Sequence, residues 1–248
     1  MDRIFAIPCK YSDENPFIYR CLDSIRKHYD DKIVVVDSNS DDKSYLDTIK
    51  DNYHNVDILD IQNNNFMTGA IWKVYKEYDS KNYYFLHDST EVLNDMSEYE
   101  RYDVVPIMVS SDWMWPNWNG SRTSEWAREQ ITKKTSIDFK EGDFDTIIGP
   151  MFIIKKKILD KLKKLNLNKI LPTKKSEMEM MERIWGLAFD YLNIKFNNNV
   201  VIKGRCSGTN YYKVSFDNYK ENSTSDITIR SFVREEGDKI IKYWSGRK

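Results

Sequence analysis

The sequence predicts an α/β fold in which helices cover both faces of a mainly parallel central sheet. Residues 3–8 and 32–37 are short runs rich in apolar and β-branched side chains, and each ends in polar turn residues. The amphipathic segment 15–29 between them is typical of a helix, so the three predict a strand, a crossover helix and a parallel strand. No linker-like composition divides the chain, and we therefore expect one domain over residues 1–248.

The same alternation continues through the first half of the chain. A helix over 42–53 would place Tyr45, Leu46 and Ile49 on one face. Residues 56–61 predict a third strand, and Thr68 is expected to cap a helix over 69–78. Residues 83–87 predict a fourth strand that leads directly into polar residues.

The second half departs from this alternation. Its predicted elements are a strand over 104–110, a helix over 124–133, a strand over 146–154, a basic amphipathic helix to about 165, a helix over 177–192, a strand over 194–203 and a last helix over 235–244. Lysines at 155–157 and 161–164 are read as the solvated face of their helix.

Composition excludes several classes of protein. Hydrophobic residues make up 40% and charged residues 31%, which is too apolar for a disordered chain. The net charge of -1 argues against a general nucleic-acid surface. Cys9, Cys21 and Cys206 show no CxxC spacing, so we expect a reducing compartment and neither a disulfide framework nor a structural zinc site. We find no signal peptide and no apolar run of about 20 residues, and expect a soluble, cytoplasmic protein.

Polar residues follow the first two predicted strands. Pro8, Asp37, Ser38 and Asp41 stand at or just after the ends of these strands. A parallel sheet binds its ligand outside the carboxyl ends of its strands. The sequence therefore predicts a ligand site at this edge.

The order of motifs over residues 3–192 resembles the nucleotide-sugar-dependent glycosyltransferases of the GT-A fold, closest to the inverting family 2. The resemblance implies a nucleotide-sugar half over 1–95, an acceptor-side half over 96–205 and an extension over 206–248. It also implies a UDP-sugar or GDP-sugar donor and a hydroxyl acceptor on a glycan, polysaccharide or glycoconjugate. The residues implied for the donor are Pro8, Tyr11, Asp37, Ser38, Asp41, Gly69 and Asp88.

The fourth strand departs from the pattern of this family. An Asp-x-Asp triplet usually holds a divalent ion against the diphosphate there, but this chain has Asp88 between His87 and Ser89. Mn²⁺ or Mg²⁺ on Asp88 and His87 would neutralise the leaving diphosphate. The alternative is that His87 is the half-buried end of a strand and Asp88 a turn residue.

Asp37 also has two interpretations. A carboxylate at the end of a buried strand is costly unless something donates hydrogen bonds to it. The resemblance implies a ribose hydroxyl or a uracil N–H as the donor. The alternative is a cap for the following helix.

The general base is expected near the start of a late helix. In the family, an acidic pair there precedes an arginine, and Glu177 stands six residues before Arg183. Glu177 and Glu179 are the predicted catalytic residues, with Glu182 as a competitor. A solvated helix face explains these glutamates too.

Aromatic and glycine positions predict the acceptor side. Trp115 and Trp118 lie in a Trp-rich loop, where aromatic side chains often bind sugars, although they could instead seal a small subdomain. Gly149 and Trp185 complete the predicted acceptor set.

Two other functions compete with the transferase. A nucleotidyltransferase should have a glycine-rich phosphate loop after its first strand, but residues 8–15 contain no glycine. A catalytically degenerate fold that binds carbohydrate or nucleotide would explain the incomplete Asp-x-Asp. The oligomeric state stays open, although Tyr243 and Trp244 could meet a partner.

Overall fold

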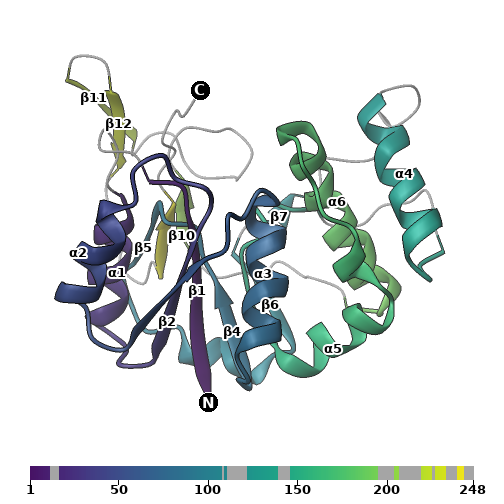
Figure 1. The fold of residues 1–248 in the computed structure, drawn as a ribbon, viewed down its shortest axis with the longest axis horizontal. Helices are drawn as coiled ribbons and strands as arrows, with labels where there is room; N and C mark the ends of the chain where they lie inside the picture. Colours follow the sequence, from purple (N-terminus) through teal and green to yellow (C-terminus); the bar gives the residue numbers. More distant parts are fainter. Residues whose placement is uncertain are drawn as a thin grey trace.

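The computed structural model describes residues 1–11, 17–107, 109–110, 122–138, 146–194, 204–206, 219–224, 227–232 and 239–242 (Figure 1). A central sheet of six strands in the order β3-β2-β1-β4-β9-β6 organises this part of the chain. Most neighbouring pairs in it are parallel, so the predicted α/β class with a mainly parallel sheet is confirmed.

The first half is the parallel part of the sheet. Its elements are β1 (Arg3–Cys9), α1 (Phe17–Arg26), β2 (Lys32–Asp37), α2 (Ser44–Asn52), β3 (Val56–Asp60), α3 (Phe66–Glu77) and β4 (Asn82–Phe85). Strands β1 and β2 are almost wholly buried, which explains why their sequences are continuous apolar runs rather than alternating ones.

The strand order reverses direction at β1. The chain moves outward from β1 to β2 and β3, and α3 then carries it back to β4 on the other side of β1. Because crossovers between parallel strands are right-handed, this reversal places α3 on the opposite face from α1 and α2. Such a switch point opens a crevice at the carboxyl ends of the strands.

The second half adds antiparallel pairs. Strand β9 (Phe152–Lys155) runs antiparallel to both β4 and β6 (Val104–Pro106). The remaining elements of this half are η1 (Ser97–Arg101), β7 (Val109–Ser110), α4 (Arg122–Lys134), β8 (Thr146–Ile147), α5 (Lys156–Lys164), η3 (Leu167–Lys169) and α6 (Lys175–Tyr191). The single strand predicted over 146–154 is wrong: a turn around Gly149, with φ of 62°, separates β8 from β9.

The predicted start of α3 is also wrong. The helix begins at Phe66, three residues before the expected position, and Thr68 lies inside it rather than capping it. Asn65 occupies the N-cap position, and its carbonyl accepts the first helical bond from Gly69 N at 3.0 Å.

The C-terminal segment returns to the first half of the chain. Strand β13 (Ile240–Lys242) pairs antiparallel with β5 (Thr90–Val92) and parallel with β10 (Gly204–Cys206). The helix predicted over 235–244 is therefore wrong for residues 240–242, where the buried, β-branched Ile240 and Ile241 favour a strand. Strands β11 (Tyr219–Thr224) and β12 (Ile227–Phe232) form a separate antiparallel pair. Within the described ranges, no helix has the length and hydrophobicity needed to cross a bilayer.

Candidate active site

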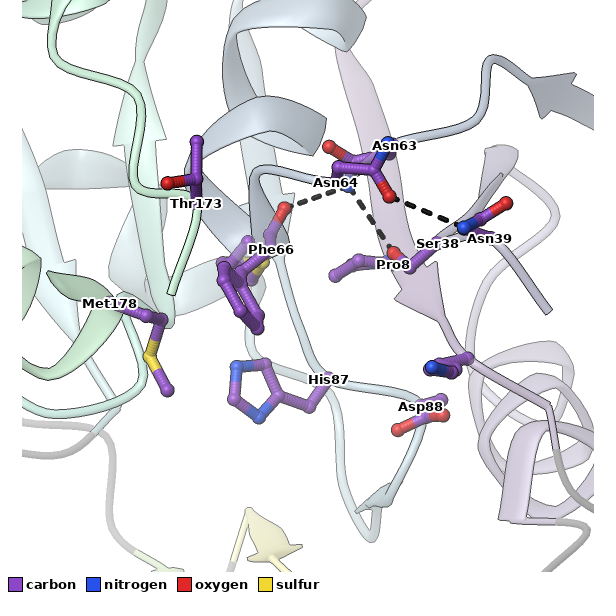
Figure 2. A pocket seen from close by; sticks show the side chains of 12 residues that line it. Pro8, Ser38, Asn39, Asn63, Asn64, Phe66, His87, Asp88, Thr173 and Met178 are labelled. Atoms are coloured by element: carbon purple, nitrogen blue, oxygen red, sulfur yellow. Dashed lines mark hydrogen bonds between the residues drawn. The ribbon is translucent and has the colours of Figure 1, made fainter. Parts of the chain in front are cut away.

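One pocket lies at the carboxyl edge of the parallel strands. Its volume is about 470 Å³, which is within the range of small-molecule sites. Figure 2 shows most of its lining side chains converging from five segments of the chain. The lining residues are Pro8, Lys10, Ser38, Asn39, Asn63, Asn64, Phe66, Met67, His87, Asp88, Thr173 and Met178.

Strand register brings these segments together. Cys9 pairs with Asp37, and Asp37 pairs with Asp60, so β1, β2 and β3 end at the same level. Ala6 pairs with Phe85, which places His87 and Asp88 beside the end of β1. Of the predicted donor residues, Pro8, Ser38 and Asp88 line the pocket together.

Asp37 has a different environment from the one predicted. Its side chain is fully buried and does not line the pocket. Oδ1 accepts a 2.8 Å hydrogen bond from the Tyr45 hydroxyl, and Oδ2 accepts backbone hydrogen bonds from Asn39 at 3.1 Å and Ser40 at 3.2 Å. Lys43 Nζ lies 3.8 Å away. Asp37 therefore holds the loop that forms one wall of the pocket, and it neither contacts the cavity nor caps α2.

Tyr11 and Asp41 lie beside the pocket rather than in it. The Tyr11 ring stacks on Tyr45 with centroids 4.5 Å apart, and its backbone N–H donates to Ser40 Oγ at 2.8 Å. Burial raises the pKa of Tyr45, so its hydroxyl remains protonated and able to donate to Asp37. Asp41 is exposed and is absent from the lining.

Asparagines form a second wall at the start of α3. Asn63 Nδ2 donates to Phe66 O at 2.8 Å and to Ser38 Oγ at 3.2 Å, which ties this wall to the loop after β2 (Figure 2). Asn39 Nδ2 donates to Asn64 Oδ1 at 3.3 Å. Gly69 does not line this pocket; a Cβ there would lie 2.8 Å from Asn65 Cβ, so its smallness lets the asparagine loop pack on α3.

Phe66 occupies an unusual backbone conformation at this wall. Its φ is 53°, which is rare for a bulky residue and is often found at functional sites. Its ring projects into the pocket above His87 (Figure 2). The pocket therefore combines an aromatic face with amide groups.

Helix α6 approaches the pocket through its first turn. Thr173 and Met178 line the cavity, and Glu177 Oε2 accepts hydrogen bonds from Thr173 N at 2.7 Å, Thr173 Oγ1 at 3.0 Å and Lys174 N at 3.2 Å. Burial raises the pKa of Glu177, but these hydrogen bonds outweigh burial and the net pKa is lowered. Glu177 thus caps α6 at the edge of the pocket, whereas Glu179 is exposed.

Glu182 is the carboxylate on α6 with the most unusual environment. It is buried, and its Oε1 accepts a 2.8 Å hydrogen bond from Gly149 N. Burial raises the pKa of Glu182 to about 7, although the Gly149 N–H lowers it in part. Gly149 in turn packs against His87, since a Cβ there would lie 2.9 Å from the imidazole Cε1.

The predicted acceptor role of Trp185 is not supported by its position. Trp185 is fully buried between Trp72, at a centroid distance of 5.8 Å, and Phe152, at 5.2 Å. It belongs to the core because it stands on the face of α6 that packs against α3 and the sheet. Trp115 and Trp118 lie outside the described residues.

Comparison with known proteins places this geometry in a family. The profile described as glycosyl transferase family 2 matches residues 5–163, more than half of the 248-residue chain. The chain belongs to glycosyl transferase family 2. The GT-A resemblance read from the sequence is thereby confirmed.

Solved structures and curated proteins were also compared with this family 2 chain. The chain is similar to the 1-349 fragment of S. aureus TarS, with 16% identity and a TM-score of 0.45 over 78% of this chain and 56% of that one. It also matches this fragment in complex with UDP-GlcNAc, at 16% identity and a TM-score of 0.43, over 73% of this chain and 53% of that one. The family 2 chain thus spans just over half the length of the TarS fragment. A search of curated proteins finds no match.

Several pocket residues of this family 2 chain were not predicted from the sequence. Lys10 is the lysine that lines the pocket, and its position two residues after Pro8 was a usable signal. Asn63 and Asn64 were not among the predicted site residues, although three consecutive asparagines after a predicted strand suit a ligand loop. Thr173 and Met178 lie 85 or more residues along the chain from the other lining residues, and the sequence carried no signal that they reach the pocket.

Proposed function

We propose that this protein transfers a sugar from a nucleoside diphosphate sugar to a hydroxyl group of a glycan, polysaccharide or glycoconjugate. The observation that carries the proposal is the convergence of Asp88, Lys10 and several amides in one pocket at the strand ends of a family 2 chain.

The pocket offers suitable partners for each part of the donor. The amides of Asn39, Asn63 and Asn64 suit the hydrogen-bonding groups of a ribose and a base, either uracil or guanine. The Phe66 ring supplies an apolar face, and the Lys10 ammonium supplies positive charge for phosphate. A UDP-sugar or a GDP-sugar is therefore the proposed donor.

A divalent ion fits the site as an ion shared with the substrate. The described residues contain no group of three His, Cys, Asp or Glu side chains that could hold a metal by themselves. Mg²⁺, however, is commonly held by one or two carboxylates and the phosphates of a substrate. Asp88 and His87 would hold Mn²⁺ or Mg²⁺ in this manner, and the ion would offset the charge of the leaving diphosphate.

The proposed reaction is a direct displacement with inversion. The acceptor oxygen forms a bond to the anomeric carbon, while the bond from that carbon to the diphosphate oxygen breaks and its electron pair leaves with the diphosphate. Glu177 is the proposed base that takes the acceptor proton, because it stands at the pocket edge and its lowered pKa keeps it ionised at neutral pH. Lys10 faces the charge that develops on the leaving group.

A second candidate function is a binding protein without turnover. The observation in its favour is that one oxygen of Glu177 already accepts three hydrogen bonds from Thr173 and Lys174. A carboxylate engaged in capping a helix is a weaker base. Such a protein would bind the donor and never consume it.

The test measures donor binding and turnover separately. Calorimetric titration with UDP and GDP, with and without Mn²⁺, should give binding to at least one nucleotide by the wild type. In the presence of Mn²⁺, Asp88→Asn should weaken that binding by roughly tenfold, about 1.4 kcal/mol, because the ion loses its carboxylate ligand. Asp60→Asn is the matched control, because Asp60 is also a strand-end carboxylate but lies outside the pocket lining. A folded wild type that binds neither nucleotide would contradict the proposal.

Turnover then separates the two candidates. The transferase with Glu177 as base predicts that the wild type hydrolyses the donor sugar. It also predicts that Glu177→Gln loses this hydrolysis but still binds the nucleotide. Glu179→Gln should behave as the wild type, because Glu179 is exposed. Binding without hydrolysis or transfer in the wild type would favour the binding protein.

A further inference from the structure

The C-terminal strand β13 delivers a buried lysine to the turn that carries Asp88. Lys242 is only 7% exposed, and its Nζ contacts Ser89 Oγ. Ser89 and Asp88 are themselves buried, at 4% and 7% exposure. A lysine side chain is seldom buried to this degree unless polar or charged groups surround its ammonium. The turn after β4 thus supplies Asp88 to the pocket lining and Ser89 to the contact with Lys242.

The charges of Lys242 and Asp88 both affect the thiol of Cys21, which lies beside the turn after β4. The thiol of Cys21 is buried, and Cys21 Sγ lies 3.7 Å from the carbonyl oxygen of His87. Burial raises the pKa of that thiol; the charge of Asp88 raises it further and the charge of Lys242 lowers it. The carbonyl group of His87, at the start of the turn, therefore faces Cys21 on α1.

The position of Lys242 is fixed by the strand that carries it. In the antiparallel ladder Lys242 pairs with Thr90 and Ile241 with Glu91, and Leu93 N donates to Lys239 O at 2.8 Å. Ile240 and Ile241 belong to this ladder and are both buried, Ile240 in the main core and Ile241 in a separate cluster with Phe17. Lys239 anchors the start of the segment, where its Nζ lies 2.9 Å from Asp95 O and 2.9 Å from Glu98 Oε1. Lys242 is thus held opposite Thr90, which follows Asp88 by two residues.

This arrangement addresses an electrostatic difficulty of the pocket. Asp88 presents a carboxylate to the cavity, and a diphosphate entering the same cavity carries negative charge of its own. Repulsion between them is strong in a partly buried site unless nearby positive charge offsets it. Lys10 offers such charge from within the pocket, and Lys242 offers it from behind the turn.

We propose that Lys242 is a positioning residue of the donor site, whose ammonium group holds the Asp88–Ser89 turn and offsets the charge of Asp88 so that the pocket accepts a nucleoside diphosphate. The inference rests on the proposed function. It makes β13 a part of the donor site, although β13 supplies no residue to the pocket lining.

The experiment compares a nucleotide that carries phosphates with a nucleoside that carries none. The affinities of the full-length chain for UDP and for uridine (GDP and guanosine, if the wild type selects guanine) are measured by calorimetry and ligand-observed NMR. Lys242→Met should weaken UDP binding about tenfold and change uridine binding less than about twofold, because only the phosphates sense the lost charge. Lys242→Arg should restore most of the UDP affinity. Lys81→Met is the matched control, because Lys81 pairs with Asp2 at 2.7 Å just before β4 begins, at the opposite end of that strand from the pocket; this variant should bind both ligands as the wild type does.

Three outcomes would overturn the inference. Equal UDP affinity in Lys242→Met and the wild type would show that the charge is not used, while the proposed function stands. Parallel losses of UDP and uridine binding would show a purely structural role. A wild type that binds UDP and GDP no better than it binds the nucleosides would remove the proposed function as well. If Lys242→Met does not fold, Ser89→Ala decides, since it keeps the lysine and removes its contact; we expect a loss of about threefold for UDP and none for uridine.

Discussion

The side chain of Glu182 accepts a 2.8 Å hydrogen bond from the backbone N–H of Gly149. This bond joins the middle of α6 to a turn with a left-handed residue, and that turn packs directly against His87. A buried carboxylate that lines no part of the pocket is thereby connected to a residue that does.

The burial of Glu182 predicts a pH-dependent stability. The folded pKa of Glu182 is about 7 and its ordinary value is 4.5, so the folded state holds its proton more tightly. The stabilisation is complete below about pH 4.5 and is lost as the pH rises through about 7, and it amounts to about 3 kcal/mol. Glu182→Gln keeps an oxygen for the Gly149 N–H and should remove this loss. Urea unfolding from pH 4 to 8 measures it.

The control for this prediction lies one turn away. Glu179→Gln removes an exposed carboxylate of α6 that raises the pKa of Glu182 only in minor part, so this variant should retain most of the pH dependence. Arg183 and Glu179 are the charged neighbours that act on Glu182. The same slope in the wild type and Glu182→Gln would assign the pH dependence to other groups.

Any side chain at position 149 is predicted to lower the stability of the protein. The φ of 62° at Gly149 disfavours alanine by about 1–2 kcal/mol, and the new Cβ would press on the His87 ring. Gly149→Ala should therefore lower both the unfolding free energy and the affinity for nucleotide. Gly149→Asn separates the two causes, because asparagine accepts the left-handed region but still adds the Cβ. Nucleotide affinity unchanged in both variants would argue against a role of this turn in the pocket.

The hydroxyl of Tyr45 is predicted to contribute more to the stability of the protein than that of Tyr53. Both donate to an aspartate, Tyr45 to buried Asp37 at 2.8 Å and Tyr53 to Asp23 at 2.7 Å in an exposed pair. Tyr45→Phe leaves a buried carboxylate short of a donor and should cost about 1–3 kcal/mol, whereas Tyr53→Phe should cost about 0.5 kcal/mol. Thermal unfolding compares them. Equal costs would mean that Asp37 does not depend on Tyr45.

Trp185 is predicted to act through packing alone. Its Nε1 is buried and has no hydrogen-bond partner within the described residues. Trp185→Ala should destabilise the protein by about 3–5 kcal/mol, and Trp185→Phe by much less, because phenylalanine retains most of the contact with Trp72 and Phe152. In Trp185→Phe the KM for an acceptor should not change. A raised KM with unchanged stability would restore the acceptor role that the sequence suggested.

The parts of the fold that the sequence predicts are those with local signals. The run Ile33–Val36 indicates a strand because a strand buried on both faces is continuously apolar. The apolar face of α2 indicates a helix because its buried residues recur every three to four positions. Short strands leave no such pattern. Strand β5 has three residues, and its partner β13 lies about 150 residues away, so only the assembled chain shows that Ile240 and Ile241 are extended.

The candidate site likewise contains residues that the sequence predicts and residues whose roles only the tertiary structure shows. Pro8, Ser38 and Asp88 were predictable because parallel strands must end together at one edge. The role of Asp37 was not, because its partner Tyr45 sits on the next helix and could have pointed elsewhere. Likewise, three glutamates within six residues of α6 look equivalent in sequence. Tertiary packing alone distinguishes the capping Glu177, the exposed Glu179 and the buried Glu182.

The contact between Ser89 and Lys242 spans 153 residues of chain. Ribosomes add on the order of 5–20 residues per second, so roughly 10–30 s separate the synthesis of its two halves. During that interval strands β1 to β4 have been made, but Lys242, which contacts the Asp88–Ser89 turn, has not yet been synthesised. Nucleotide capture should consequently be one of the last properties that a newly made molecule acquires.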